Sequence, residues 1–177
     1  MTHRENCTPE VEKQLNIFGT KPGMKVLELG PYTDIYFKKK FVHEREMKYT
    51  SIDRFQCNGE GCYIGLMEAL PFPANSFDVV FACHAFEHTE RPVDTIREAH
   101  RVLRPGGLLL FITPPHGEHH IIKADHDHIN VATEIQLKRF LMYVGGWKEF
   151  EVYTQTEHPE WSLIPQDYNV ITWAKKQ

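Results

Sequence analysis

The sequence predicts an α/β protein with a mostly parallel sheet, and three observations support this. Strand-like apolar runs alternate with segments of helical spacing, which favours a sheet with helices packed on it. The run Phe77 to Cys83 is nearly all apolar, as in a strand that is buried on both faces. No long helix separates the two last strand-like runs, 150–153 and 170–173, so we expect these two to pair antiparallel.

The expected strands are short β-rich runs bounded by turn signals. The first follows the turn sequence Pro22-Gly23, and the second ends at Asp53. Before the late pair, the expected strands span residues 24–29, 49–52, 62–64, 77–83 and 108–112, the third showing the weakest pattern.

Helices are expected between these strands. Pro92 suits a first helical position, and apolar residues follow it at helical spacing until Pro105-Gly106-Gly107, which should stop the helix. Thr133 and Gln136 have the spacing of a capping box and predict the start of a later helix. The segment 33–46 is also expected to be helical, with a less regular pattern.

Length and composition exclude several classes of protein. The 177 residues fit a single domain, with a short extension of about 20 residues before the first strand. Hydrophobic residues make up 41% of the chain, too many for a disordered protein, and the net charge of −4 argues against a dedicated nucleic-acid binder. No run approaches the ~20 apolar residues of a membrane span.

Two further features predict a cytoplasmic location. The polar N-terminus lacks the apolar stretch of a secretory signal. The four cysteines are not spaced as CxxC pairs, and they fit a reduced cytosolic protein better than a disulfide framework: Cys7, Cys57, Cys62 and Cys83. The sequence leaves the oligomeric state open.

A strand that ends in an acid and a glycine stands out near the N-terminus. Glu28 and Gly30 end the first expected strand, and Asp53 ends the second, about 20 residues later. Ligands of parallel sheets bind beyond the carboxyl ends of the strands, where both acids would lie. A carboxylate at this spacing can grip ribose hydroxyls, and the glycine allows close backbone approach. From these residues alone, the alternative that both acids only cap helices or turns is equally supported.

Four motifs then follow in a fixed order, and their order is more specific than any one of them. They are Leu70-Pro71-Phe72-Pro73, Ser76 to Val80, Glu87-His88, and Arg101 to Gly107. This arrangement resembles the class I S-adenosylmethionine-dependent methyltransferases, especially the small-molecule group with a Glu-His pair after the fourth strand. The resemblance covers roughly residues 20–176. It implies a Rossmann-like seven-stranded, mostly parallel sheet with a final antiparallel strand and helices on both faces.

The resemblance also implies S-adenosylmethionine as the cofactor and methyl transfer to a small acceptor. Glu28 and Gly30 match the motif that holds the methionine part of the cofactor, with Pro31 and Tyr32 in the same loop. Asp53 matches the acid that binds both ribose hydroxyls. The other cofactor-binding residues that the resemblance implies line the adenine or lie near the sulfonium: Arg54, Phe55, Leu66, Met67, Glu68, Cys83 and His84.

Two departures from the family pattern lead to a first alternative. Only the first glycine of the usual glycine-rich loop is present, in the sequence Gly30-Pro31-Tyr32-Thr33-Asp34. Leu66 stands where many relatives have an aspartate for the adenine amine. The alternative is therefore a cofactor-binding protein that lacks turnover. Some similar sequences with a Gly-Pro-Tyr loop lie beside sugar-modifying genes, so a sugar or another metabolite is the expected acceptor.

Three histidines are the predicted catalytic residues. Methyl transfer from a sulfonium requires alignment and exclusion of water rather than a covalent intermediate. A base is needed only where the acceptor starts protonated, and histidine can serve near neutral pH. The candidates are His84 and His88, after the fourth expected strand, and His116, after the fifth.

A histidine-rich segment supplies a second alternative. Five of the eleven histidines lie in the segment 116–128, together with two aspartates. Imidazoles and carboxylates bind transition metals, so His119, His126 and His128 are candidate ligands, although no standard zinc spacing is present.

The length of this connection favours a different role for it. About twenty residues link the strand 108–112 to Thr133, against roughly 2–6 in an ordinary strand-to-helix loop. We therefore expect the segment 114–130 to border the acceptor pocket without needing a metal, with His116 facing the acceptor.

Overall fold

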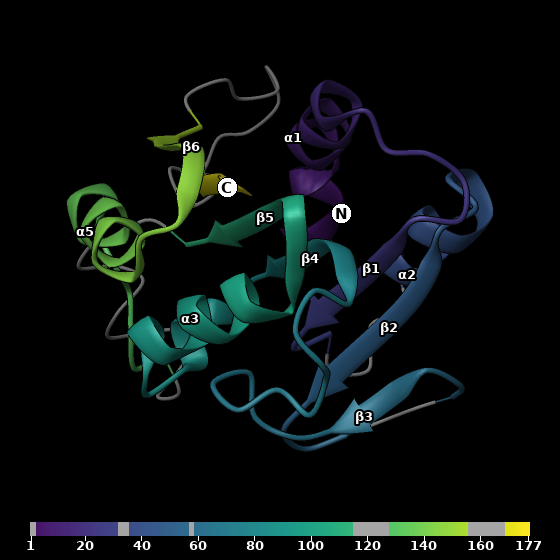
Figure 1. Ribbon diagram of the computed structural model, residues 1–177, viewed down its shortest axis with the longest axis horizontal. Helices are drawn as coiled ribbons and strands as arrows, with labels where there is room; N and C mark the ends of the chain where they lie inside the picture. Colours follow the sequence, from purple (N-terminus) through teal and green to yellow (C-terminus); the bar gives the residue numbers. More distant parts are fainter. Residues whose placement is uncertain (1–2, 32–35, 57–58, 115–127, 156–168) are drawn as a thin grey trace.

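A computed structural model describes residues 3–31, 36–56, 59–114, 128–155 and 169–177 (Figure 1). Within these ranges, one seven-stranded sheet crosses the molecule in the order β3-β2-β1-β4-β5-β7-β6. β7 runs antiparallel to β5 and β6, and all other neighbouring strands are parallel. The strands are β1 (Lys25–Leu29), β2 (Lys48–Asp53), β3 (Cys62–Ile64), β4 (Phe77–Cys83), β5 (Leu103–Thr113), β6 (Trp147–Thr154) and β7 (Val170–Lys176). The predicted fold class is confirmed.

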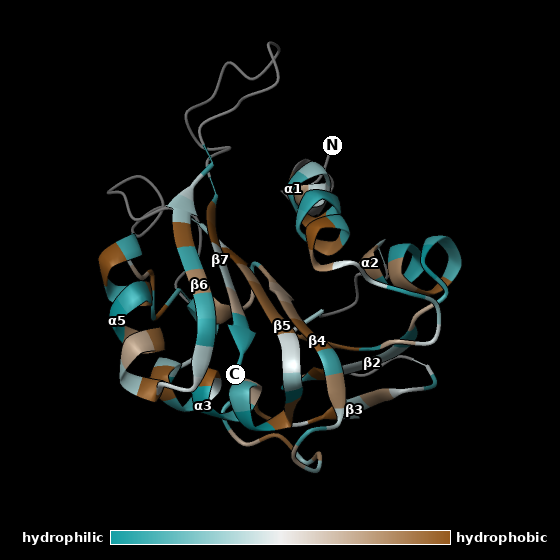
Figure 2. Cartoon of the chain, turned by 45° about the horizontal axis from the view of Figure 1, so that its top comes forward, coloured by the Kyte–Doolittle hydropathy of each residue, from teal (hydrophilic) through white to brown (hydrophobic). Residues whose placement is uncertain are grey.

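Helices cover both faces of this sheet. In Figure 2, α1 and α2 lie on one side of the strands, and α3 and α5 lie on the other. The described helices are α1 (His3–Phe18), α2 (Tyr36–Lys39), the π-helical turn η1 (Lys40–Glu44), the 3-10 turn η2 (Phe86–His88), α3 (Pro92–Val102) and α5 (Glu134–Val144). None of them combines the length and the apolar composition that crossing a membrane would require.

β4 shows why the central strands are apolar throughout. Successive side chains of a strand point to opposite faces of the sheet. Val79 and Phe81 join the core cluster on the side of α1 and α2, whereas Val80 and Ala82 join the cluster formed with α3 and α5. Both faces are therefore buried, as the continuous apolar run predicts.

The predicted end of α3 is wrong. Pro92 lies in the first turn as expected, but the helix ends at Val102. Leu103 is already extended and pairs with Phe77, so β5 begins there and the sequence Pro105-Gly106-Gly107 lies inside β5. Pairing with β4 thus ends the helix three residues before the turn-forming tripeptide.

The other helix predictions stand closer to the structure. Thr133 and Gln136 form the predicted capping box at the start of α5, each side chain accepting a hydrogen bond from the other residue's backbone N–H. The expected helix over 33–46 corresponds to α2 followed by η1, which together span 36–44. Residues 32–35 lie outside the described ranges.

Residues 3–18, in the segment expected to be a short extension, form α1, a helix that the sequence analysis does not predict. Cys7, Val11 and Leu15 recur at four-residue spacing on α1 and are buried in the core. Glu10 is also buried and accepts a hydrogen bond from Tyr153 Oη of β6. The contact between Glu10 and Tyr153 joins α1 to β6, the edge strand of the sheet.

The expectation that every cysteine is reduced is wrong for Cys62. This residue is disulfide-bonded at the start of β3, whereas Cys7 and Cys83 carry free, buried thiols. The cytoplasmic location stays a prediction.

The chain order brings three strand ends together. β1 pairs with β2 on one side and with β4 on the other, so the order of the strands reverses at β1. In parallel sheets, ligands bind at such a reversal, beyond the carboxyl ends of the strands. Leu29, Asp53 and Cys83 end β1, β2 and β4 at this edge.

Candidate active site

A cavity of about 930 Å³ opens at this edge of the sheet. It is within the range of roughly 300–1,000 Å³ that small-molecule and cofactor sites occupy. Its walls come from the ends of β1, β2 and β4, the connections that follow β1 to β4, and one residue shortly before α5. The lining residues are Gly30, Pro31, Ile52, Asp53, Arg54, Phe55, Gln56, Gly65, Leu66, Met67, Glu68, His84, Ala85, His88, Thr89, Glu90 and Ile129.

Most predicted site residues meet in this cavity. Of those that the structure describes, all line it except Glu28 and Cys83. Glu28 is fully buried on β1, and its carboxylate accepts a hydrogen bond of 2.6 Å from Tyr49 Oη. Cys83 is buried in the core cluster on the side of α1. Tyr32 and His116 lie outside the described residues.

Gly30 lies where the end of β1 closely approaches the connection after β4. Its φ of 63° lies in the left-handed region, and a Cβ built on it would lie only 2.6 Å from Ala85 Cβ. Its N–H donates to Ile52 O at 2.8 Å, which ties the end of β1 to β2. A larger residue would close the passage between the ends of β1 and β4.

Asp53 both caps a turn and lines the cavity. Its Oδ1 accepts hydrogen bonds from the backbone N–H groups of Phe55 at 2.9 Å and Gln56 at 3.3 Å, so it caps the turn after β2. It also lines the cavity while its side chain is only 6% exposed. The capped turn therefore fixes the carboxylate at the cavity wall.

The side of the cavity next to Asp53 is apolar and open. Phe55 is 66% exposed and Leu66 is 45% exposed, although both line the cavity. The Arg54 guanidinium lies 4.7 Å from the centroid of the Phe55 ring. Met67 continues this wall and reaches to 3.7 Å from the Cβ built on Gly30. Such a surface suits a flat aromatic ring.

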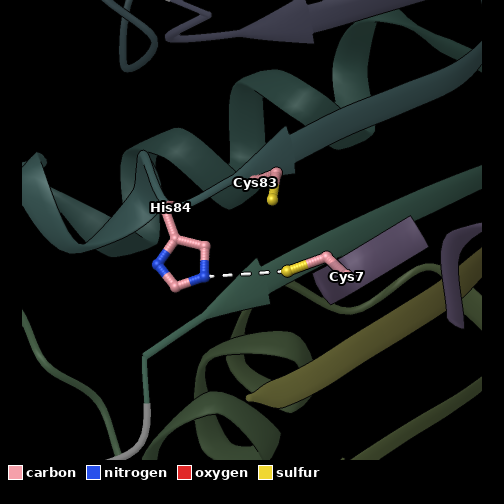
Figure 3. A group of neighbouring side chains, drawn as sticks. All are labelled: Cys7, Cys83 and His84. Atoms are coloured by element: carbon pink, nitrogen blue, oxygen red, sulfur yellow. Dashed lines mark hydrogen bonds between the residues drawn. The ribbon is translucent and has the colours of Figure 1, made fainter. Parts of the chain in front are cut away.

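His84 begins the opposite wall, directly after β4. Its φ of 50° is unusual for a residue with a side chain, and its N–H donates to Ile112 O of β5 at 2.9 Å. Its Nε2 lies 2.9 Å from Asn169 Oδ1 and shares a hydrogen bond of 3.8 Å with Cys7 Sγ. Figure 3 shows this last contact, with Cys83 at the end of β4, directly before His84.

The surroundings of His84 favour its protonated form. The Nδ1 atom of His84 lies 3.6 Å from Glu87 Oε1, and its Nε2 atom faces Asn169 Oδ1. Both ring nitrogens therefore face oxygen atoms that can accept hydrogen bonds. Burial alone would lower the pKa of His84, but the bond to Cys7, the charge of Glu87 and the bond to Asn169 together raise it above its usual value.

η2 carries Glu87, which is buried behind this wall, and His88, which forms part of it. Phe86 is fully buried and packs its ring 5.2 Å from that of Phe111, which holds the turn in place. Glu87 is buried beside it, and His88 lines the cavity. The His88 ring lies 4.9 Å from the ring of His128.

Sequence reasoning missed the residues that support His84. Cys7 and Asn169 are 77 and 85 residues away from it along the chain, so no local motif connects them. Glu87 was visible as half of a Glu-His pair, but no role was assigned to it. The four-residue spacing of Cys7 with Val11 and Leu15 is the one signal that would have placed Cys7 on a buried helix face.

Comparisons with known proteins agree with this architecture. A family model described as a methyltransferase domain matches residues 33–111. A malonyl-acyl-carrier-protein O-methyltransferase of Coxiella burnetii is 48% identical over 50 residues, which is 28% of this chain and 18% of that protein. A ubiquinone/menaquinone biosynthesis C-methyltransferase of a Shewanella species is 28% identical over 169 residues, covering 86% of this chain and 67% of that protein.

A solved structure extends the likeness to the whole fold. Phosphoethanolamine N-methyltransferase 2 of Haemonchus contortus, determined with S-adenosylhomocysteine and phosphomonomethylethanolamine, superposes with a TM-score of 0.72 at 15% identity. The match covers 92% of this chain and 51% of that one. The matched domain, the seven-stranded order and the cavity at the strand reversal agree with one another: residues 33–111 match a methyltransferase domain, and the chain has the fold of the class I S-adenosylmethionine-dependent methyltransferases.

Proposed function

We propose that the chain transfers the methyl group of S-adenosylmethionine to a small acceptor that enters the cavity beside His84 and His88. The observation that carries this proposal is the pairing of Gly30 and Asp53 in one cavity at the reversal of strand order. Close backbone approach at Gly30 and a fixed carboxylate at Asp53 are what a ligand with a ribose and an amino-acid arm needs.

The residues of the cavity fit the parts of this cofactor. Gly30 and Pro31 border the space for the methionine part, where any Cβ on Gly30 would intrude. The Asp53 carboxylate would accept hydrogen bonds from both ribose hydroxyls. The apolar wall of Phe55 and Leu66 would cover the adenine. When bound, the cofactor supplies a methyl group on a sulfonium, an activated donor.

The acceptor side is the wall after β4. His84 and His88 lie there, and Ile129 closes the cavity from the segment before α5. These residues would orient the acceptor and exclude water from it, which is the main task of the protein in a transfer from a sulfonium. His84 is held by three neighbours and presents a fixed hydrogen-bonding surface.

The names of the relatives suggest two kinds of methylated atom. One relative is named for O-methylation of a malonyl thioester and another for C-methylation in quinone biosynthesis. The chain spans 18% and 67% of the lengths of these two proteins, so their acceptors are starting points for a screen. The sugar acceptor stays a prediction from the sequence.

Two measurements test the proposal. Calorimetric titration of the chain with S-adenosylhomocysteine should show one bound equivalent. Labelled S-adenosylmethionine should then transfer its methyl group to a member of a panel of malonyl thioesters, quinols and sugars. Cofactor binding with no transfer to any member of the panel would favour the alternative of a binding protein without turnover. Absence of cofactor binding would overturn the proposal.

A further inference from the structure

The least explained group in the described part of the molecule is the Glu87 carboxylate. Glu87 is 1% exposed, and neither of its oxygens has a hydrogen-bond partner there. An ionised carboxylate in such a position costs several kcal/mol unless a charge or several donors compensate it. His84 Nδ1 approaches Glu87 Oε1 only to 3.6 Å.

Two imidazoles lie beside this carboxylate. Single ligand atoms of Glu87, His88 and His128 all lie within 4.8 Å of one another. Nδ1 of His128 is buried and also has no hydrogen-bond partner among the described residues. The backbone N–H of Asn130 donates to Glu87 O at 2.9 Å and so holds the residues after 127 against η2.

We propose that Glu87, His88 and His128 bind a zinc ion at the edge of the cavity. Two imidazoles and one carboxylate are the protein ligands of many catalytic zinc sites, which keep a further position open. Zinc–ligand distances of about 2.0–2.2 Å place neighbouring ligand atoms of a tetrahedral site roughly 3.4 Å apart. Side-chain movements of about an ångström would therefore close the observed group around the ion.

The place of this site suggests a use for its open position. His88 lines the cavity, as does Ile129, the residue after His128. An oxygen of the acceptor could therefore complete the coordination, and the ion would polarise it. This part of the inference rests on the proposed function, whereas binding of the ion does not.

A second group of potential ligands is less suited to an ion. Ligand atoms of Cys7, Cys83 and His84 also lie within 4.8 Å of one another. However, Cys7 and His84 already share a hydrogen bond, and His84 Nε2 has a second partner in Asn169. A metal there would have to displace these hydrogen bonds, whereas a metal at Glu87 would supply a partner that both Glu87 oxygens and His128 Nδ1 lack among the described residues.

Zinc titration of the chelator-treated full chain tests the site directly. We expect one equivalent by calorimetry and by elemental analysis. Glu87→Gln keeps the side-chain volume, and His128→Ala removes a half-buried ring; each should weaken zinc binding by roughly a hundredfold. His43→Ala removes an exposed histidine of η1 and should change nothing.

Three further variants separate the competing sites and functions. Cys7→Ser should leave zinc affinity unchanged, as should His119→Ala and His126→Ala. Absence of zinc binding by the wild type, or loss of zinc in Cys7→Ser, would overturn the proposal. Loss of zinc in His119→Ala together with normal zinc affinity in Glu87→Gln would also overturn it. S-adenosylhomocysteine titrations of the same samples report on the cofactor site, and retained affinity also shows that a variant is folded. A chain that binds zinc but not the cofactor would contradict the proposed function alone.

Discussion

The two walls of the cavity are built in different ways. On the wall formed by β1 and β2, Gly30 and Asp53 are held by backbone hydrogen bonds to residues that are close in the sequence or on the neighbouring strand. On the wall after β4, His84 is held by Cys7 and Asn169, from opposite ends of the chain. The first wall depends on local geometry, and the second depends on the finished tertiary structure.

This difference separates what is common in the fold from what is particular to the chain. A cofactor of constant shape can be held by a turn that short motifs encode. A wall that binds the acceptor, as proposed for the residues after β4, must differ between enzymes; here long-range contacts hold it, and among the described residues the buried Glu87 behind it lacks hydrogen-bond partners. Changes on the two walls should therefore affect cofactor binding and acceptor turnover separately.

The largest effect is expected from Gly30→Ala. The new Cβ would meet Ala85 Cβ at 2.6 Å and sit on a residue with positive φ. Calorimetry should show a loss of S-adenosylhomocysteine affinity of about a hundredfold or more. Gly106→Ala is the matched control, since its φ is 77° but its added Cβ would meet nothing within 4 Å. The variant at residue 106 should lose stability and keep cofactor affinity; an equal loss of affinity in both would contradict the close-approach argument.

Asp53→Asn should have the next largest effect. The amide oxygen can still cap the turn, but the charge that strengthens hydrogen bonds to the ribose is gone, and hydrogen bonds to charged groups contribute about 1.5–3 kcal/mol. We expect the affinity for S-adenosylhomocysteine to fall at least tenfold. Asp78→Asn provides the comparison, because Asp78 accepts a backbone hydrogen bond from Lys25 outside the cavity. Unchanged affinity in Asp53→Asn would remove this residue from the cofactor site.

Asn169→Ala should affect only the acceptor wall. The variant removes the partner 2.9 Å from His84 Nε2. We expect methyl transfer to fall several-fold while S-adenosylhomocysteine affinity stays within twofold of the wild type. A parallel loss of cofactor affinity would show that the two walls are not independent.

The smallest effect is expected at Glu10, which helps to dock α1 on the sheet. The position of Cys7 depends on this docking because Cys7 lies on α1. Burial raises the pKa of Glu10, but hydrogen bonds with Gln14, Tyr153 and Lys13 outweigh it and hold the pKa below its usual value of 4.5. A lowered folded-state pKa stabilises the fold above pH 4.5, and this contribution is lost as the pH falls through the folded-state value. Glu10→Gln should cost about 1 kcal/mol at pH 7 in urea unfolding.

The pH dependence of unfolding supplies the control for Glu10. Wild type and variant should converge in stability as the pH falls below 4.5, because the wild-type carboxylate then becomes protonated. A difference that stays constant down to the lowest pH would show that the charge of Glu10 does not anchor α1.

The sequence was sufficient for the sheet because its strands are encoded locally. The apolar run of β4 and the capping box of Thr133 express period and capping within a few residues. It was insufficient for the end of α3, where strand pairing of Leu103 overrides the turn signal at Pro105. α1 was missed because its buried stripe is short and polar residues surround it.

The site residues also divide into those that a local pattern predicts and those that tertiary packing places. The places of Gly30 and Asp53 at the cavity could be predicted, because each residue lies at the end of a strand that a local pattern encodes. Glu28 was assigned to the cofactor, yet on this strand its side chain is buried against Tyr49 and does not line the cavity. The partners of His84 could not be predicted, because only the packing of α1 and β7 against the end of β4 brings them there.

The central claim is that the cavity between these two walls binds the methyl donor. Calorimetric titration of S-adenosylhomocysteine into the wild type, Asp53→Asn and Asn169→Ala tests it most directly. The account predicts one equivalent bound by the wild type, affinity weakened at least tenfold in Asp53→Asn, and affinity unchanged in Asn169→Ala. Absence of binding to the wild type, or equal affinity in all three proteins, would contradict it.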